Sequence, residues 1–539
     1  MRLPILCFVT VLAAAGLAAA QPAVLGPYAS AEEQQQAMAQ GRATSEALVR
    51  AALARIAALD HAGPRLNAVI AVSPNALAEA RARDSQRRDR MAKGPLFGIP
   101  MLVKDNIETA DGLPTTAGSL ALADNVTGRD APLALRLKAA GAVIIGKANL
   151  SEWANFRSSR SLSGWSAVGG MVRNPYSLDR SACGSSSGSA AAVAAGYVAA
   201  AIGTETDGSI TCPAAANGLV GFKPTVGLVS RTFVVPISAE QDTAGPIART
   251  VRDAAAVLAA ISGADPADPA TREADARKTD FVAGLDKAAL KGTRIGVLRG
   301  TAGGSPQTEA VFEQALAALR DAGAILVDVK PLTREQRMQI SAGEDFALNA
   351  EFKAQVEAYL AATPARQKVR TLDQLIAFNK ATPAETTLFG QEIFEEAVKS
   401  PPLTDAKYKD QRATARRVAT EGLETMLREA KVEAIVAASG PPVFMIDAVN
   451  GDAFGGGTSA LPAVAGAPHL TVPMGQVSGL PVGMSFIGPR WSDARVLSLG
   501  YAFEQMTHAW REPRFLPTVQ AQPMVGRAFD PHAPGATRR

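Results

Sequence analysis

The chain has 539 residues, of which 47% are hydrophobic and 20% are charged, and its 55 Lys and Arg residues nearly balance 51 Asp and Glu residues. This composition excludes a disordered or fibrous protein, and the length is sufficient to bury a large core. Because the body of the chain has no long run of Lys or Arg, we do not expect it to bind nucleic acid.

The first twenty residues have the pattern of a secretory signal peptide. Arg2 precedes an apolar run, and small residues ending at Ala20 precede Gln21 and Pro22. We therefore expect cleavage near Ala20 and a periplasmic or secreted mature protein. The apolar run is too short to predict a membrane span, and no later segment has eighteen uninterrupted apolar residues, so we expect no stable membrane insertion.

Beyond the signal peptide, short apolar runs that predict strands alternate with runs of helical periodicity. The predicted strands lie at 98–103, 142–146, 293–300, 324–330 and 432–438. The predicted helices lie at 44–59, with Thr44 or Ser45 as the N-cap, and at 131–141 and 307–322. This alternation indicates an α/β fold in which one sheet is covered by helices on both faces.

Three further segments define the organisation of the chain. Residues 265–275 are polar and contain proline, which is typical of a surface connection. Residues 332–430 are more charged and mostly helical in pattern, and we expect them to form a cap over a site on the sheet. Residues 515–539 are rich in Pro, Gly and Arg without periodicity, so we expect a loose tail after a single domain at 21–514.

Cysteine and histidine are scarce in the mature chain. Only Cys183 and Cys212 remain after the signal peptide, which is too few for a disulfide framework, and their spacing does not suit zinc. The two residues could form one disulfide, but we expect small buried thiols. The sequence has no H-E-x-x-H motif and no cluster of Cys or His, so we expect neither a metal nor a cofactor.

Residues 183–215 are the most unusual stretch, because small residues dominate it and hydroxyl groups gather at both ends. A tight Ala-rich helix bracketed by turns is as good an interpretation as a catalytic loop. Residues 184–188 also fit G-x-S-x-G, the nucleophile elbow of esterases, with Ser186 as the nucleophile. Of the four histidines only His469 is well placed to assist, and its strand-like surroundings are more typical of a structural residue.

Residues 141–147 have the G-x4-G-K spacing of a phosphate-binding loop. However, Ala148 occupies the position where a magnesium-binding hydroxyl is required. The four residues between the two glycines are Ala, Val, Ile and Ile, which predict a buried strand and not a loop that surrounds a phosphate. We therefore favour a structural role for this segment.

A third possibility requires no histidine. Lys104 directly follows the apolar run at 99–103 and precedes Asp105 and Asn106. A lysine that is buried at such a strand end has a lowered pKa, so its uncharged amine can act as a base for a serine. A lysine at the end of a strand is more often solvated, and the pattern alone leaves both interpretations open.

Four segments together resemble the amidase signature family, and the resemblance extends from about residue 44 to residue 507. They are VKDNI around Lys104, GSSSGSAAAVAAG from Gly184, GTETDGSITCPAA from Gly203 and GLVGFKPTVGLVS from Gly218. Residues 151–157, 163–170 and 209–213 are most similar to the peptide amidases of that family, which remove the C-terminal amide of peptides. The resemblance implies a central mixed, twisted sheet covered by helices, with a helical cap.

The resemblance also implies a catalytic set of Ser, cis-Ser and Lys. It assigns the nucleophile to Ser209, the base to Lys104 and the bridging serine, which follows a cis peptide bond after Gly184, to Ser185. Thr204 and Glu205 fall on family positions that support the lysine and order the loop. The implied oxyanion hole consists of the backbone N–H groups of Thr206, Asp207, Gly208 and Ser209. Candidates for substrate contact, with core packing as the equal alternative, are Trp153, Asn155, Phe156 and Trp165.

Two residues depart from the pattern of many family members, which have Gly at the position of Ser187 and Arg at the position of Thr211. Because Thr211 lies in a stretch that is similar to peptide amidases, it favours a peptide amide over a small amide as the substrate. Two alternatives stay open. One is an amidase of small aliphatic or aryl amides, and the other is a periplasmic protein that binds peptides without chemistry.

Overall fold

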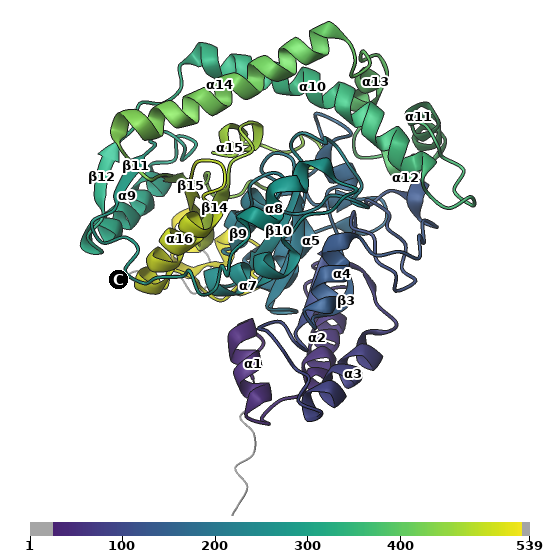
Figure 1. Ribbon diagram of the computed structural model, residues 1–539, viewed down its shortest axis with the longest axis horizontal. Helices are drawn as coiled ribbons and strands as arrows, with labels where there is room; N and C mark the ends of the chain where they lie inside the picture. The colour runs from purple at the N-terminus through teal and green to yellow at the C-terminus, as the bar shows by residue number, and fades with distance from the viewer. Residues whose placement is uncertain (1–24, 531–539) are drawn as a thin grey trace, which may run out of the picture.

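The computed structural model describes residues 25–530, so the predicted signal peptide lies outside the described residues. Its centre is a single sheet of eleven strands (Figure 1). In spatial order the strands are β1 (Val69–Val72), β3 (Val143–Ala148), β2 (Pro100–Lys104), β8 (Ala200–Glu205), β10 (Thr243–Ala248), β9 (Val220–Lys223), β14 (His469–Val477), β15 (Leu480–Ile487), β13 (Ala434–Ala438), β11 (Arg294–Val297) and β12 (Ile325–Asp328).

The sheet is mixed. β2 runs parallel to both β3 and β8, whereas β14 and β15 are antiparallel. The five predicted strands are present as β2, β3, β11, β12 and β13. Side chains of β2 alternate between two apolar clusters, because Met101 and Val103 pack on one side of the sheet and Leu102 packs on the other. Both faces of the sheet are therefore covered, which confirms the predicted α/β class.

One apolar cluster contains residues of α4 (Pro132–Ala139), α7 (Val251–Ile261), α9 (Pro306–Asp321) and α16 (Asp493–Thr507). The other contains residues of α2 (Ser45–Leu59), α3 (Ala76–Arg88), α5 (Ser187–Ala194) and α6 (Thr211–Ala216). The helix predicted at 44–59 is α2, and the Thr44 hydroxyl caps it by accepting a hydrogen bond from the N–H of Ala47 at 3.0 Å. Its buried face is centred on Val49, Ala52 and Ile56.

The Ala-rich segment after the hydroxyl cluster forms α5, in which every residue is buried. A Cβ atom at Gly188 would lie 2.3 Å from the carbonyl oxygen of Ala68, so only glycine allows this approach. Small side chains therefore bring α5 close to the backbone beside β1. This packing fixes the segment that begins at Ser185 against the sheet.

Residues 334–430 form a layer of helices that arches over one side of the sheet in Figure 1. Its helices are α10 (Arg334–Ala361), α11 (Leu372–Ala381), α12 (Pro383–Thr386), α13 (Glu392–Val398) and α14 (Ala406–Ala430). The two long helices α10 and α14 lie side by side, and a Cβ atom at Gly343 would lie only 2.8 Å from that of Ala415. Phe352 of α10 stacks on Phe394 of α13, with ring centroids 5.1 Å apart.

The C-terminal segment differs from the expected loose tail over residues 515–530. The Leu178 N–H donates to the carbonyl of Leu516 at 2.8 Å, and Val519 is buried. A short helix, α17 (Pro523–Phe529), follows. A sequence without periodicity does not reveal such backbone contacts, and residues 531–539 of the predicted tail lie outside the described residues. No helix within residues 25–530 is long and apolar enough to cross a bilayer.

Candidate active site

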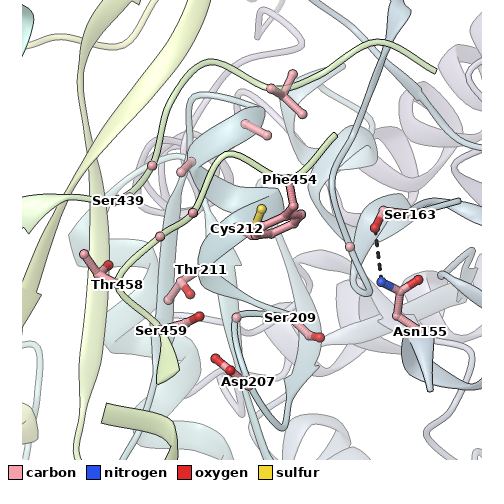
Figure 2. Close-up of a pocket in the computed structure, with 18 of the residues that line it drawn as sticks. Asn155, Ser163, Asp207, Ser209, Thr211, Cys212, Ser439, Phe454, Thr458 and Ser459 are labelled. Carbon is pink, nitrogen blue, oxygen red and sulfur yellow. Dashed lines mark hydrogen bonds between the residues drawn. The ribbon is translucent and has the colours of Figure 1, made fainter. Parts of the chain in front are cut away.

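A cavity of about 290 Å³ lies at one edge of the sheet (Figure 2). Segments that are distant in the sequence line it, among them residues 154–156, 206–209, 439–444 and 454–459, together with Leu348 of α10. The helical layer therefore contributes directly to the cavity. Because β2 and β8 are parallel, their last residues, Lys104 and Glu205, end at the same edge of the sheet.

Lys104 is the last residue of β2, and its side chain is fully buried. Its Nζ atom lies 2.7 Å from the Ser185 Oγ and 2.8 Å from the Thr204 Oγ1. No carboxylate among the described residues forms an ion pair with it. Burial lowers the pKa of Lys104 from 10.5 to about 7, although the more distant charges of Asp242 and Glu205 oppose this change. Near neutral pH, a large share of this lysine is uncharged.

Ser185 follows a cis peptide bond from Gly184 and is fully buried. Its carbonyl accepts a hydrogen bond from the N–H of Ser151 at 3.0 Å. A Cβ atom at residue 184 would lie 2.1 Å from the Ser151 Oγ, so glycine is required there. The backbone contact with Ser151 and the close packing at Gly184 thus hold Ser185 in place, with its hydroxyl in contact with the Lys104 amine.

Ser209 lies in the turn that connects β8 to α6 and lines the cavity, where Figure 2 shows its side chain. Glu205 shapes this turn, because its Oε2 atom accepts hydrogen bonds from the N–H groups of Ile210 and Thr211 at 2.7 and 3.0 Å. The N–H of Ser186 donates to the carbonyl of Ser209 at 3.1 Å. This bond joins the turn that carries Ser209 to the segment that carries Ser185.

The backbone of the same turn offers hydrogen-bond donors to the cavity. Thr206, Asp207, Gly208 and Ser209 all line it. Within residues 25–530, no backbone or side-chain acceptor binds the N–H groups of the last three. Gly208 has a φ of +77°, and a Cβ atom there would lie 3.0 Å from the Ser459 Oγ. Free N–H groups beside a serine hydroxyl are suited to stabilise the oxyanion of a tetrahedral intermediate.

The structure does not assemble the nucleophile elbow that Ser186 and His469 could have formed. The buried Ser186 hydroxyl donates to the carbonyl of Thr204 at 3.1 Å and accepts from its N–H at 3.2 Å. His469 lies at the cavity, but its Nε2 atom is 2.7 Å from the Ser485 Oγ, and burial lowers its pKa to about 3. Among the described contacts, none joins Ser186 to His469. Both residues have structural partners.

The segment with phosphate-loop spacing is the buried strand β3, as its apolar residues predict. The Nζ of Lys147 lies 3.3 Å from the Asp105 Oδ1 and donates to the carbonyl of Ile107 at 2.5 Å. This lysine therefore stabilises the core beside β2. No group of His, Cys, Asp or Glu within residues 25–530 could hold a metal ion.

Two of the four candidate substrate contacts line the cavity, namely Asn155 and Phe156. The other two are core residues. Trp153 is buried against Phe394 at 6.0 Å, and Trp165 is buried against Phe389 at 5.1 Å. For these two residues the structure favours the alternative interpretation, core packing, because side chains of the helical layer cover both rings. Sequence reasoning also missed Leu348, Phe444 and Phe454, which line the cavity.

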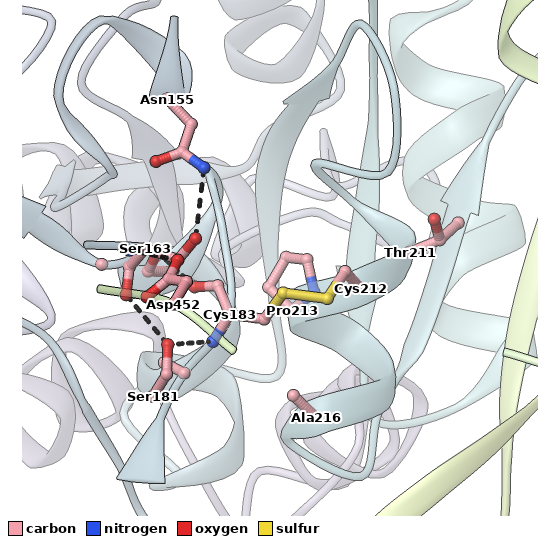
Figure 3. Close-up of a disulfide and its surroundings, with 12 residues drawn as sticks. Asn155, Ser163, Ser181, Cys183, Thr211, Cys212, Pro213, Ala216 and Asp452 are labelled. Carbon is pink, nitrogen blue, oxygen red and sulfur yellow. Dashed lines mark hydrogen bonds between the residues drawn. A yellow bond between two sulfur atoms is a disulfide. The ribbon is translucent and has the colours of Figure 1, made fainter. Parts of the chain in front are cut away.

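The expectation of two free thiols was also wrong. Cys183 and Cys212 form a disulfide, with their Cα atoms 6.0 Å apart (Figure 3). Cys183 directly precedes Gly184, and Cys212 lies in the first turn of α6. The two cysteines are 29 residues apart in the sequence, and only the fold of the intervening α5 and β8 brings them together. The disulfide links the segment before Ser185 to the helix after Ser209.

Comparison with known proteins agrees with this geometry. Residues 47–497 match the family model described as Amidase. A probable amidase of Arabidopsis thaliana is 39% identical over 497 residues, which cover 90% of this chain and 92% of the relative. The chain belongs to the amidase signature family. As a member, it is a hydrolase that acts on amides, and the predicted family and fold are confirmed.

Solved structures place this amidase close to peptide amidases. The native peptide amidase of Stenotrophomonas maltophilia is 50% identical, with a TM-score of 0.85, and the match covers 91% of this chain and 99% of that one. A peptide amidase in complex with the competitive inhibitor chymostatin is also 50% identical, with a TM-score of 0.87, and 91% and 100% of the two chains are covered. The helical layer and the cavity therefore lie on a fold shared with these enzymes.

Proposed function

We propose that this amidase hydrolyses the C-terminal carboxamide of peptides to a carboxylic acid and ammonia. The observation that carries the proposal is the 2.7 Å contact between the buried Nζ of Lys104 and the Ser185 hydroxyl, beside the turn that holds Ser209. The similarity to peptide amidases supports the choice of substrate. Thr211, whose hydroxyl lies 3.3 Å from the carboxylate of Glu205, belongs to the stretch that favours this substrate class.

The first chemical step is acylation of the enzyme. Uncharged Lys104 takes a proton from Ser185 as Ser185 takes one from Ser209, and the Ser209 Oγ forms a bond to the amide carbon. Negative charge then develops on the carbonyl oxygen. The free backbone N–H groups in the turn at 206–209 stabilise this oxyanion in a site shielded from water, where their effect is large.

The second step releases ammonia. Protonated Lys104 returns its proton through Ser185 to the amide nitrogen, and the carbon–nitrogen bond breaks to leave an acyl-enzyme on Ser209. Water then attacks the ester, with the same lysine as the base, and the acid leaves. Thr204 accepts a hydrogen bond from the lysine amine throughout, and Glu205 keeps the turn in shape.

The substrate class is tested by ammonia release from an amidated peptide and from a small aliphatic amide such as propionamide. We expect kcat/KM for the peptide amide to exceed that for propionamide by about a hundredfold or more, because contacts beyond the amide contribute several-fold to a hundredfold each. Equal values would assign the enzyme to small amides. Saturable peptide binding without ammonia would instead indicate a binding protein.

We also propose that the enzyme is exported to the periplasm or beyond. Two independent features support this proposal, namely the signal-peptide pattern that ends near Ala20 and the disulfide between Cys183 and Cys212. Cell fractionation with N-terminal sequencing is expected to find a chain that begins near Gln21 outside the cytoplasm. A full-length cytoplasmic protein with three free thiols would contradict export.

A further inference from the structure

One side of the cavity is closed by a glycine-rich strap, which we define as residues 452–458. At one end, the Asp452 Oδ2 accepts a hydrogen bond from the N–H of Ser163 at 2.8 Å (Figure 3). At the other end, the buried Thr458 hydroxyl lies 2.9 Å from the Ser485 Oγ. The five residues between these anchors, 453–457, are exposed, and three of them are glycines that line the cavity.

Phe454 is the only large apolar side chain of the strap. It lines the cavity and is nevertheless 60% exposed. Its ring lies 5.8 Å from that of Phe444, which also lines the cavity. An exposed aromatic ring at the edge of a cavity that holds a nucleophile is well placed to gain contact area when an apolar group enters.

Phe444 and Phe454 extend an apolar surface that begins at the disulfide. Cys183, Ala216 and Val443 form a small buried cluster, against which Cys212 and Phe444 pack. We define the apolar wall by the five of these residues that line the cavity, which are Cys212, Ala216, Val443, Phe444 and Phe454. None of these side chains carries a charge. Figure 2 labels Cys212 and Phe454 among the residues that line the cavity.

A polar pair also lines the cavity. The Asn155 side chain donates from Nδ2 to the Ser163 hydroxyl at 3.1 Å, and both residues line the cavity (Figures 2 and 3). The Asn155 Oδ1 atom is buried and has no hydrogen-bond partner in the described part of the chain. An acceptor without a partner suits the backbone N–H of a peptide, whereas the uncharged apolar wall suits a side chain.

We infer that the apolar wall and the strap form the subsite for the side chain of the substrate's C-terminal residue, and that the enzyme selects large apolar residues there. The inference rests on the proposed peptide substrate. In the acyl-enzyme, the carbonyl carbon is bonded to Ser209, and the Cα atom that carries this side chain is bonded to the same carbon. The side chain therefore has to lie in the cavity that Ser209 shares with the wall.

The experiment compares N-acetyl-alanyl amides whose C-terminal residue is Phe, Leu, Gly or Asp. For the native enzyme we expect kcat/KM for the Phe amide to exceed that for the Gly amide by about a hundredfold and the Asp amide to be the poorest substrate. Phe454→Ala is expected to reduce the ratio of Phe to Gly about tenfold, by loss on the Phe amide. Phe454→Leu, which keeps an apolar contact, is expected to reduce it less.

Phe529→Ala is the matched control, because Phe529 is 71% exposed, lies in α17 and does not line the cavity. It is expected to leave the ratio unchanged. Since Phe454 is exposed, its variants should have the same thermal unfolding midpoint as the native enzyme, and a thermal scan verifies this. The subsite alone is overturned if Phe454→Ala leaves the ratio of kcat/KM for the Phe and Gly amides unchanged. It is also overturned if the native enzyme hydrolyses the Phe and Gly amides equally well. Turnover of propionamide but of none of the peptide amides overturns the proposed function and the subsite together.

Discussion

Lys104→Met is expected to lower kcat for amide hydrolysis about ten-thousandfold while the protein stays folded. Methionine fills nearly the same apolar volume as the stem of lysine, so the buried site keeps its packing. The variant lacks the amine whose Nζ lies 2.7 Å from the Ser185 hydroxyl. Without that base, neither Ser185 nor Ser209 has an acceptor for its proton, and general base catalysis contributes at most about this factor.

The pH dependence follows from the same residue. Burial lowers the pKa of Lys104 to about 7, so the uncharged form increases as the pH rises through 7 and decreases below it. We expect kcat/KM for the native enzyme to fall about tenfold for each pH unit below that value. The residual activity of Lys104→Met should lack this acidic limb, because the variant has no amine at this position to protonate.

Steady-state ammonia release between pH 5 and pH 9 measures both effects. Lys93→Met is the matched control, since Lys93 is exposed, and it should keep the native rate and the native pH profile. An acidic limb that persists in Lys104→Met would assign the proton transfer to another group. Far-ultraviolet circular dichroism and the thermal midpoint show whether each variant has the native fold.

Ser209→Ala is expected to lower kcat about a millionfold, whereas Ser186→Ala should lower it by no more than about tenfold. Loss of a nucleophile removes the covalent path entirely. Ser186, although it stands at the centre of the G-x-S-x-G pattern, has both hydrogen-bonding functions occupied by the backbone of Thr204. Its replacement removes both hydrogen bonds and leaves the buried N–H of Thr204 without this acceptor, so we expect about 1 to 3 kcal/mol of lost stability.

Continuous apolar runs made five of the eleven strands predictable from the sequence. β2, β3 and β13 are buried along their whole length, and the runs of apolar residues in them indicate this burial. β8 and β10 were not predicted, because Ala, Gly, Thr and Pro dominate them. Those small residues are required by packing. A Cβ atom at Gly245 of β10 would lie 2.1 Å from the carbonyl oxygen of Phe222, so a typical strand residue could not stand there.

The site was predictable only where its residues share a local segment. The segments around Lys104 and residues 184–215 carry the family resemblance, and the fold brings Lys104 against Ser185 at the shared edge of β2 and β8. The apolar wall was not predictable, because its residues come from α6, the loop after β13 and the strap. The disulfide was missed for the same reason, since tertiary packing alone brings its two halves together.

The central claim is that Ser209 carries the acyl group, and direct detection of that intermediate tests it. The native enzyme is mixed with an amidated peptide, and the reaction is quenched in acid during turnover. The protein is then digested, and the masses of its fragments are measured by mass spectrometry. We predict a peptidyl adduct on Ser209 in the fragment that contains it, and no adduct in Ser209→Ala. That variant should also release ammonia about a millionfold more slowly. An adduct on Ser186, or undiminished ammonia release from Ser209→Ala, would contradict the mechanism.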